Sequence, residues 1–178
     1  FWSDHGQEIA YSEMAAFAEP ETPFRSLIDP DDPRFVEPGK MPEKIQSYCR
    51  DTEQPVPHNP GQIIRCIYES LALRYAEIWR KLIRYTGEPP DTLTNGGGGC
   101  PDHLLNRFTA KALGTATTAG PAEATGLGNI LVQMMADGSI PSLKKGRRLI
   151  GESFPVKQYE PENTEAWAEA ASKFAKFT

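Results

Sequence analysis

Three features of the sequence predict a helix-rich α/β domain. Apolar residues recur at helical spacing throughout the stretch 59–87, which is long enough for a central helix. Two short segments, 91–96 and 115–118, have strand character. Four consecutive glycines, 96–99, separate the first of these from a predicted helix. The order strand, loop, helix, strand, helix inside an otherwise helical chain indicates an α/β architecture.

The predicted helix over 59–87 has clear start and stop signals. Asn59 is a good N-cap, Pro60 suits the first turn, and Gln62 completes a box-like arrangement. Gly87, followed by two prolines, ends the helix. Its apolar residues lie on more than one side, so we expect it to pack between layers. They include Ile63, Ile67, Leu71, Ile78 and Trp79.

The rest of the chain is predicted to be mostly helical. Further helices are expected at 1–19, 41–52, 101–113, 121–137, 142–152 and 163–177. The segment 19–42 contains six prolines, which exclude a long helix or a central strand. Because it also carries Phe24, Leu27 and Phe35, we expect a loop packed on the core, within a single domain spanning 1–178.

Composition excludes several classes of protein. With 178 residues, 39% hydrophobic and 24% charged, the chain is long enough for one core and is not compositionally disordered. A net charge of −5 argues against binding to nucleic acid or an anionic membrane, and no apolar run approaches the roughly 20 residues of a membrane span. Cys49, Cys66 and Cys100 are odd in number and widely spaced, which favours neither a disulfide framework nor zinc. A reducing cytoplasm is therefore the expected location.

The glycine run is the most unusual part of the sequence. Without Cβ atoms, residues 96–99 allow a ligand to approach the backbone closely, and the following helix start offers free N–H groups. The pattern matches neither the P-loop nor the GxGxxG dinucleotide motif. A nucleotide-binding loop and a plain helix-entry turn both remain open on this evidence.

Other notable residues are expected to be structural. Trp79 and Trp167 are predicted to lie in the core, and Gly126 and Gly128 to permit close helix packing. Glu123 is expected in the first turn of a helix, where a carboxylate complements the helix dipole. The scattered histidines predict no metal site.

Two longer motifs resemble the C-terminal signature of the FGGY carbohydrate kinases, and the rhamnulokinase branch in particular. The first runs from Gly97 to Asn106 and resembles the branch pattern GGGxQNxLLNQ. The second runs from Ala119 to Ile130 and resembles AGPVEATxLGNxxxQ, with Gln133 at the final glutamine. Weaker similarity extends upstream to Ile28 and downstream to Pro161, so the resemblance covers nearly the whole chain.

The resemblance implies a fold. These kinases have two ribonuclease-H-like domains of the actin and sugar-kinase type, with ATP between them. The chain would then be a partial C-terminal domain that lacks its first strands, a three-stranded antiparallel ribbon. One edge of its sheet would be unpaired, or completed by a partner, and such an edge also permits self-association.

The resemblance also implies a nucleotide site. Gly98 and Gly99 would meet the adenine and ribose, and Gly97 would shape the turn. Asp102 stands where the family usually has an asparagine that hydrogen-bonds the nucleotide, and Pro101 replaces a glutamine. An ionised aspartate only accepts hydrogen bonds, and its charge is unfavourable near phosphates. The catalytic aspartate and the phosphate-binding turn of the family lie upstream of the matched region, so no catalytic residue is assigned here.

The implied function is that of one part of a kinase. The full-length parent would use ATP and Mg²⁺ to phosphorylate a ketose such as L-rhamnulose, or a related sugar, at O1. This segment would supply the adenosine side of the cleft, the missing N-terminal domain would bind the sugar, and the segment by itself would be inactive. The alternative is a non-catalytic remnant or interaction module that binds no nucleotide.

Overall fold

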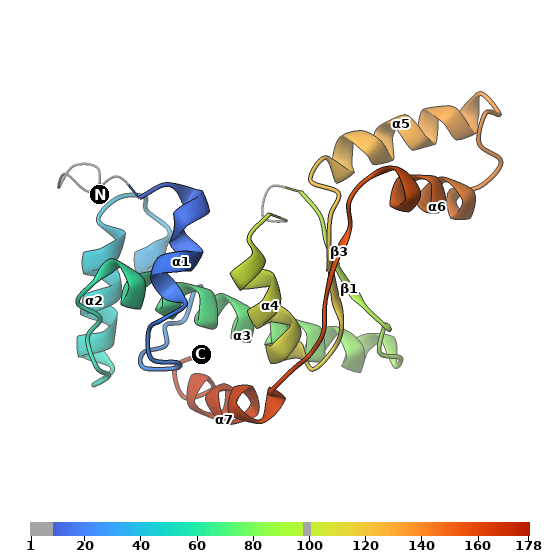
Figure 1. The fold of residues 1–178 in the computed structure, drawn as a ribbon. Coiled ribbons are helices and arrows are strands. Elements are labelled where there is room, and N and C mark those ends of the chain that lie inside the picture. Colours follow the sequence, from blue (N-terminus) through green and yellow to red (C-terminus); the bar gives the residue numbers. More distant parts are fainter. Residues whose placement is uncertain (1–8, 98–100) are drawn as a thin grey trace.

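A computed structural model of the chain describes residues 9–97 and 101–178. None of the helices in these two ranges is both long enough and apolar enough to span a membrane. In chain order the structure contains the short 3₁₀ turn η2 (Tyr11–Glu13), α1 (Met14–Ala18), η3 (Pro33–Phe35), α2 (Met41–Asp51), α3 (Pro60–Thr86), β1 (Leu93–Asn95), α4 (His103–Leu113), β2 (Thr117–Ala119), α5 (Ala124–Ala136), α6 (Leu143–Ser153), β3 (Lys157–Tyr159) and α7 (Thr164–Phe174). The helix-rich α/β class is as predicted (Figure 1).

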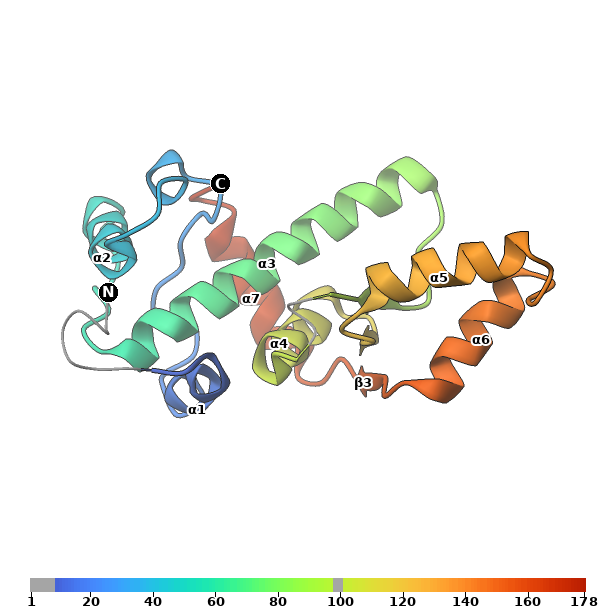
Figure 2. The same cartoon turned by 90° about the horizontal axis from the view of Figure 1, so that it is seen from above.

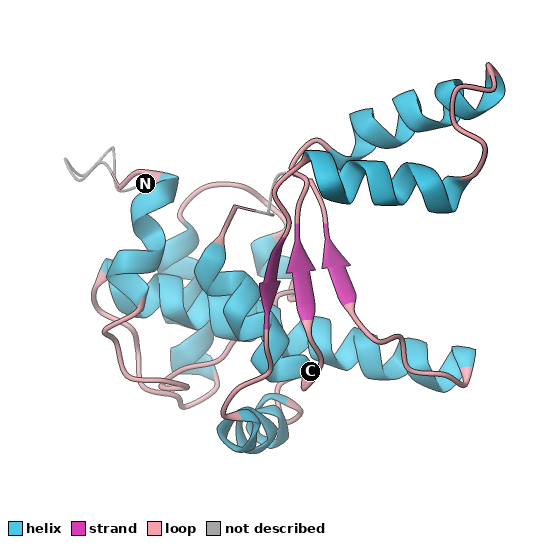
Figure 3. Cartoon of the chain, turned by 45° about the vertical axis from the view of Figure 1, so that its right-hand side comes forward, coloured by secondary structure: helices cyan, strands magenta, loops and turns pink. Residues whose placement is uncertain are grey.

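The sheet has three short strands in the order β1-β2-β3 (Figure 3). β1 and β2 run parallel, as expected for strands joined through the crossover helix α4, and β3 pairs antiparallel with β2. The expectation of only two strands was therefore wrong. Strand β3 is three residues long and two of them, Lys157 and Gln158, are polar and exposed, so it lacks the alternation that would reveal it in the sequence.

Helix α3, with 27 residues, is the longest of the described helices (Figure 2). Its N-terminus is capped as predicted, with Gln62 N–H donating to Asn59 Oδ1 at 2.8 Å. The Gln62 side chain accepts from the His58 N–H, one residue before the cap, so the capping box is shifted by one position. Gly87 ends the helix in the left-handed conformation, φ +80°.

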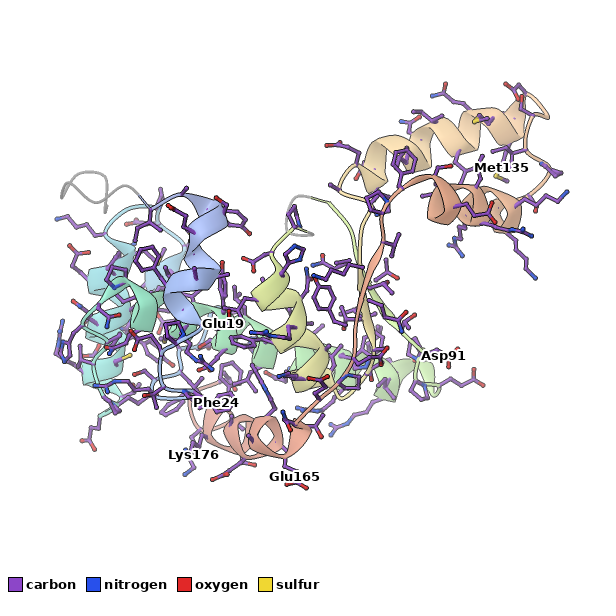
Figure 4. All side chains as sticks on the ribbon, in the orientation of Figure 1. Glu19, Phe24, Asp91, Met135, Glu165 and Lys176 are labelled. Atoms are coloured by element: carbon purple, nitrogen blue, oxygen red, sulfur yellow. The ribbon has the colours of Figure 1, made fainter. Side chains whose placement is uncertain are left out.

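The main core forms where α3 meets α1, α4 and α7. Its apolar side chains include Leu27, Ile64, Leu73, Leu104, Phe108, Trp167 and Phe174. Phe24, placed between these helices by the proline-rich segment, packs edge-on against Trp167 with ring centroids 4.8 Å apart (Figure 4). Trp79 and Trp167 are both buried, as expected.

The proline-rich segment 19–42 is held to α3 by polar contacts as well as by packing. Ile28 N–H donates to Ser70 Oγ at 3.0 Å, and Phe24 N–H donates to Glu69 Oε2 at 2.7 Å. Leu27 exchanges two hydrogen bonds with the side-chain amide of Gln54. Backbone groups that the prolines keep out of regular structure are thus satisfied by side chains.

Helices α5 and α6 form a hairpin that projects from the end of the sheet, and Met135 on it lies far from Glu19 and Phe24 (Figure 4). The close packing expected at Gly126 and Gly128 is not found, because nothing lies within 4 Å of a Cβ built on either residue. The close contact is instead at Gly146 on α6, where an added Cβ would lie 2.0 Å from Leu131 Cδ1. Leu131 is the buried residue of α5.

The pKa values of two glutamates on α3 are shifted in opposite directions. Glu69 is buried, and burial raises its pKa although Arg65 Nε donates to it at 2.7 Å. Glu77 is hydrogen-bonded by Lys81, which lowers its pKa with further help from Arg74. Burial is therefore the main cause of the raised pKa of Glu69, and the hydrogen bond from Lys81 is the main cause of the lowered pKa of Glu77.

Replacing each glutamate by glutamine should change the pH dependence of stability with opposite sign. The folded-state pKa of Glu69 is raised, so its stabilising contribution is full below the unfolded pKa of about 4.3 and is lost as pH rises. Glu69→Gln should therefore gain stability relative to the parent chain between pH 4 and 7. Glu77, whose folded-state pKa is lowered, contributes stability that is full above the unfolded pKa of about 4.3 and is lost as pH falls below it. Glu77→Gln should therefore lose stability relative to the parent chain as pH rises through the acid range below about 4.3, and stay less stable by a constant amount above it.

Urea unfolding of both variants at a series of pH values measures the two trends. The pair acts as a matched control, since each variant removes one carboxylate from the same helix. Parallel trends for the two variants would contradict the assigned directions.

Candidate functional site

The glycine segment connects the carboxyl end of β1 to the start of α4. Gly97 has φ +91°, a conformation that favours glycine. Its neighbour Gly96 lies close to the start of α5, where an added Cβ would stand 3.0 Å from the Cβ of Ala124. Gly98 and Gly99, the two residues expected to meet adenosine, lie outside the described residues.

Asp102 is the N-cap of α4. Its Oδ1 accepts a hydrogen bond from Leu105 N–H at 3.0 Å, and its Oδ2 accepts one from the Tyr68 hydroxyl. The residue is 6% exposed. The helix therefore begins at His103, two residues later than predicted, because Asp102 has the extended backbone of a cap.

Tyr68 contacts Asp102 from the first half of α3. Burial, then the hydrogen bond and charge of Asp102, raise the pKa of Tyr68 far above its usual value. The pKa of Tyr11 is raised too, first by burial and then by Asp102. Tyr68 consequently remains a protonated donor throughout the physiological pH range. No sequence pattern pointed to this contact, since the two residues are 34 positions apart.

The ends of β1, β2 and α4 are joined by one hydrogen bond between two asparagine side chains and one between backbone groups. Asn95 Nδ2 donates to Asn106 Oδ1 at 2.8 Å, and Asn95 O accepts from Gly120 N–H at 3.0 Å. Asn106 is 1% exposed. The carboxyl ends of the two parallel strands thus meet at the glycine segment, the place where α/β sheets bind ligands.

The opposite side of α4 is tied to β3. His103 Nδ1 and the Tyr159 hydroxyl are hydrogen-bonded 2.6 Å apart. Glu123 is the N-cap residue of α5, as expected near a helix start, but its side chain makes no capping hydrogen bond. Among residues 9–97 and 101–178 no group of three or more histidines, cysteines or acids could hold a metal ion.

The arrangement is suited to binding a ligand by backbone approach. A glycine turn and the N-terminus of an eleven-residue helix lie at the ends of two parallel strands. The one buried carboxylate beside them already accepts hydrogen bonds on both oxygens.

Comparison with solved structures identifies the fold as that of a sugar kinase. The crystal structure of xylulose kinase from Rhodospirillum rubrum superposes with a TM-score of 0.64 at 16% sequence identity, over 98% of this chain and 34% of that protein. The family model for the C-terminal domain of the FGGY family of carbohydrate kinases matches residues 2–136. The chain belongs to this family.

Rhamnulokinases are among its relatives. The rhamnulokinase of Bacteroides thetaiotaomicron is 44% identical over 173 residues, which are 97% of this chain and 35% of that enzyme. The rhamnulokinase of Enterococcus faecalis is 44% identical over 86% of the chain, and that of Bacillus subtilis 36% identical over 88%. The chain spans about a third of the length of these relatives.

Two substitutions at Asp102 should separate its structural roles from its charge. Asp102→Ala removes the cap and leaves the buried Tyr68 hydroxyl and Leu105 N–H without their acceptor, so we expect a loss of about 2 kcal/mol. Asp102→Asn keeps a capping oxygen and a polar partner for Tyr68, and should cost less than about 0.5 kcal/mol.

Denaturant unfolding of the two variants measures the difference. Equal losses would show that the carboxylate charge, rather than hydrogen-bonding capacity, stabilises the start of α4.

Proposed function

We propose that the chain is the nucleotide-side part of a sugar kinase that transfers a phosphoryl group from ATP to O1 of a ketose such as L-rhamnulose. The observation that carries this proposal is its membership of the FGGY family together with rhamnulokinase relatives at 36–44% identity. The same kinase would act in the cytoplasm, where ATP is available and where the buried thiols of Cys49 and Cys66 stay reduced.

The proposed nucleotide site consists of Gly97, Gly98, Gly99 and Asp102. The glycines would lie against the adenosine, because a loop without Cβ atoms admits a planar ligand to van der Waals contact. Mg²⁺ would neutralise charge on the phosphates and would be held, with the sugar and the catalytic base, by the part of the kinase outside this third. The segment alone is then expected to be inactive.

The remainder of the kinase would contact the sheet edge at β1. Leu93 N–H and Asn95 C=O bond toward β2, so the backbone N–H and C=O of Thr94 face the outer edge, where no described strand lies. Beside this edge is an apolar groove of about 350 Å³, lined in part by Tyr75, Ile78 and Leu82 of α3.

Those three α3 side chains are 40–54% exposed. We propose that a strand from the preceding part of the kinase pairs with β1 and covers the groove. When that part is absent, a second copy of the chain could pair with the same edge.

A hybrid enzyme tests the function. The matched 173 residues of the Bacteroides rhamnulokinase are replaced by the matched part of this chain, and ATP consumption is measured with and without L-rhamnulose. We expect sugar-dependent phosphorylation within about tenfold of the intact relative, since the nucleotide side of the cleft would be preserved. The isolated chain provides the control and should show none.

The alternative function is a non-catalytic remnant. The observation that favours it is the carboxylate of Asp102, which brings a negative charge where the resembled kinases have asparagine. A hybrid that folds, shown by a cooperative thermal transition, but neither phosphorylates L-rhamnulose nor binds ATP in calorimetry would support the remnant and contradict the kinase proposal.

A further inference from the structure

Helix α5 of the projecting hairpin is uncharged and largely uncovered. Its 13 residues include no aspartate, glutamate, lysine or arginine, yet Leu131 is its one buried residue. Ile130 and Val132 are 55% and 63% exposed. A helix that is apolar on all sides is normally enclosed by protein. In this structure α6 covers the side of α5 that carries Leu131, and the rest of the apolar surface of α5 is open.

An apolar groove lies along the hairpin between α5 and α6. It has a volume of about 210 Å³, and its lining includes Ile130 of α5 with Leu149 and Phe154 on the α6 side. These three side chains are 40–55% exposed. Of the fourteen large hydrophobic side chains that are exposed among the described residues, seven lie between positions 130 and 156. Exposure concentrated in this way indicates an interaction surface, whereas scattered exposed residues do not.

The charges beside the groove restrict what can cover it. Helix α6 carries four exposed basic residues and one acid, Glu152, which pairs with Arg148; the other three basic residues are Lys144, Lys145 and Arg147. Because the whole chain has a net charge of −5, the hairpin is a basic region on an acidic molecule. A symmetric contact between two copies would bring the two basic helices together, which is unfavourable. An apolar surface flanked by acidic residues is the better complement.

The polypeptide that could supply such a surface lies outside this chain. The chain spans 35% of the Bacteroides rhamnulokinase, and the family model that it matches is that of a C-terminal domain. The superposition on xylulose kinase takes in 98% of the chain, so it extends over the hairpin. The hairpin is therefore part of the fold of a complete sugar kinase, and about two thirds of such an enzyme is available to cover it.

We propose that the groove between α5 and α6 is a docking surface for the sugar-side part of the same kinase, which covers Ile130, Leu149 and Phe154 with apolar side chains flanked by acidic residues. The inference rests on the proposed function and adds a contact separate from the sheet edge at β1. Helix α5 begins four residues after β2. The contact therefore places the sugar-side part beside the carboxyl ends of the two parallel strands (Figure 1).

The reactivity of a cysteine placed in the groove tests this contact. Ile130→Cys is made in the chain alone and in the hybrid with the Bacteroides rhamnulokinase, and its alkylation rate is read by mass spectrometry of the α5 peptide. We expect alkylation to be at least about tenfold slower in the hybrid, because a covered groove reacts only during local opening. Where Ile130→Cys or this hybrid fails to fold, Leu149→Cys across the groove and a hybrid built on the Enterococcus faecalis enzyme carry the same expectation.

Glu165→Cys is the matched control. Glu165 is an exposed residue of α7 and lies far from Met135 of the hairpin (Figure 4). Its alkylation rate should differ by less than about twofold between the chain and the hybrid. Slowing at this position equal to that at Ile130 would show a general effect and overturn the assignment of the groove.

The outcomes separate the docking surface from the kinase activity. Equal alkylation of Ile130→Cys in the chain and in an active hybrid would overturn the docking surface and leave the proposed function intact. Slow alkylation in the chain alone that becomes faster on dilution would show that a second copy covers the groove, and would overturn the proposal as well. A hybrid that protects the groove but does not phosphorylate L-rhamnulose would support the docking surface and contradict the proposed function.

Discussion

The packing of α4 across α3 is the contact on which the rest of the structure depends. Leu104 and Phe108 of α4 pack into the main core with Ile64, Tyr68 and Leu73 of α3. Because β1 and β2 are joined only through α4, this contact also fixes where the parallel strands lie. The same packing positions Gly96 and Gly97, which follow directly after β1.

The sequence predicts the elements whose causes are local. Helix α3 follows from Asn59, Pro60 and Gly87 together with the helical period, and the end of α4 follows from Gly114 in the left-handed conformation. The strand pair β1 and β2 follows from the glycine segment and a β-branched run. These signals lie within a few residues of the structure that they specify.

Features that depend on contacts between residues far apart in the sequence cannot be predicted from local signals. Strand β3 exists because Lys157 to Tyr159 can pair with β2, not because its own residues favour a strand. Gly126 and Gly128 looked like packing positions, but the small residue that packing requires is Gly146, which faces Leu131 across the hairpin. The candidate site shows the same division: the motif identifies Asp102, and only the fold brings Tyr68 to it.

The pattern of burial differs between the two halves of α3. The first four turns of α3 are packed in the main core with α1, α4 and α7 and against α2. Tyr75, Ile78, Leu82 and Tyr85, by contrast, are substantially exposed. Apolar side chains exposed to water beside a sheet edge with unpaired N–H and C=O groups are unfavourable. Such surfaces are usually buried against another segment of protein. The half of α3 that carries Tyr68 is buried in the core, while the half beside β1 leaves apolar side chains exposed. The contact between Tyr68 and Asp102 and the exposed apolar stripe beside β1 therefore depend on different halves of one helix.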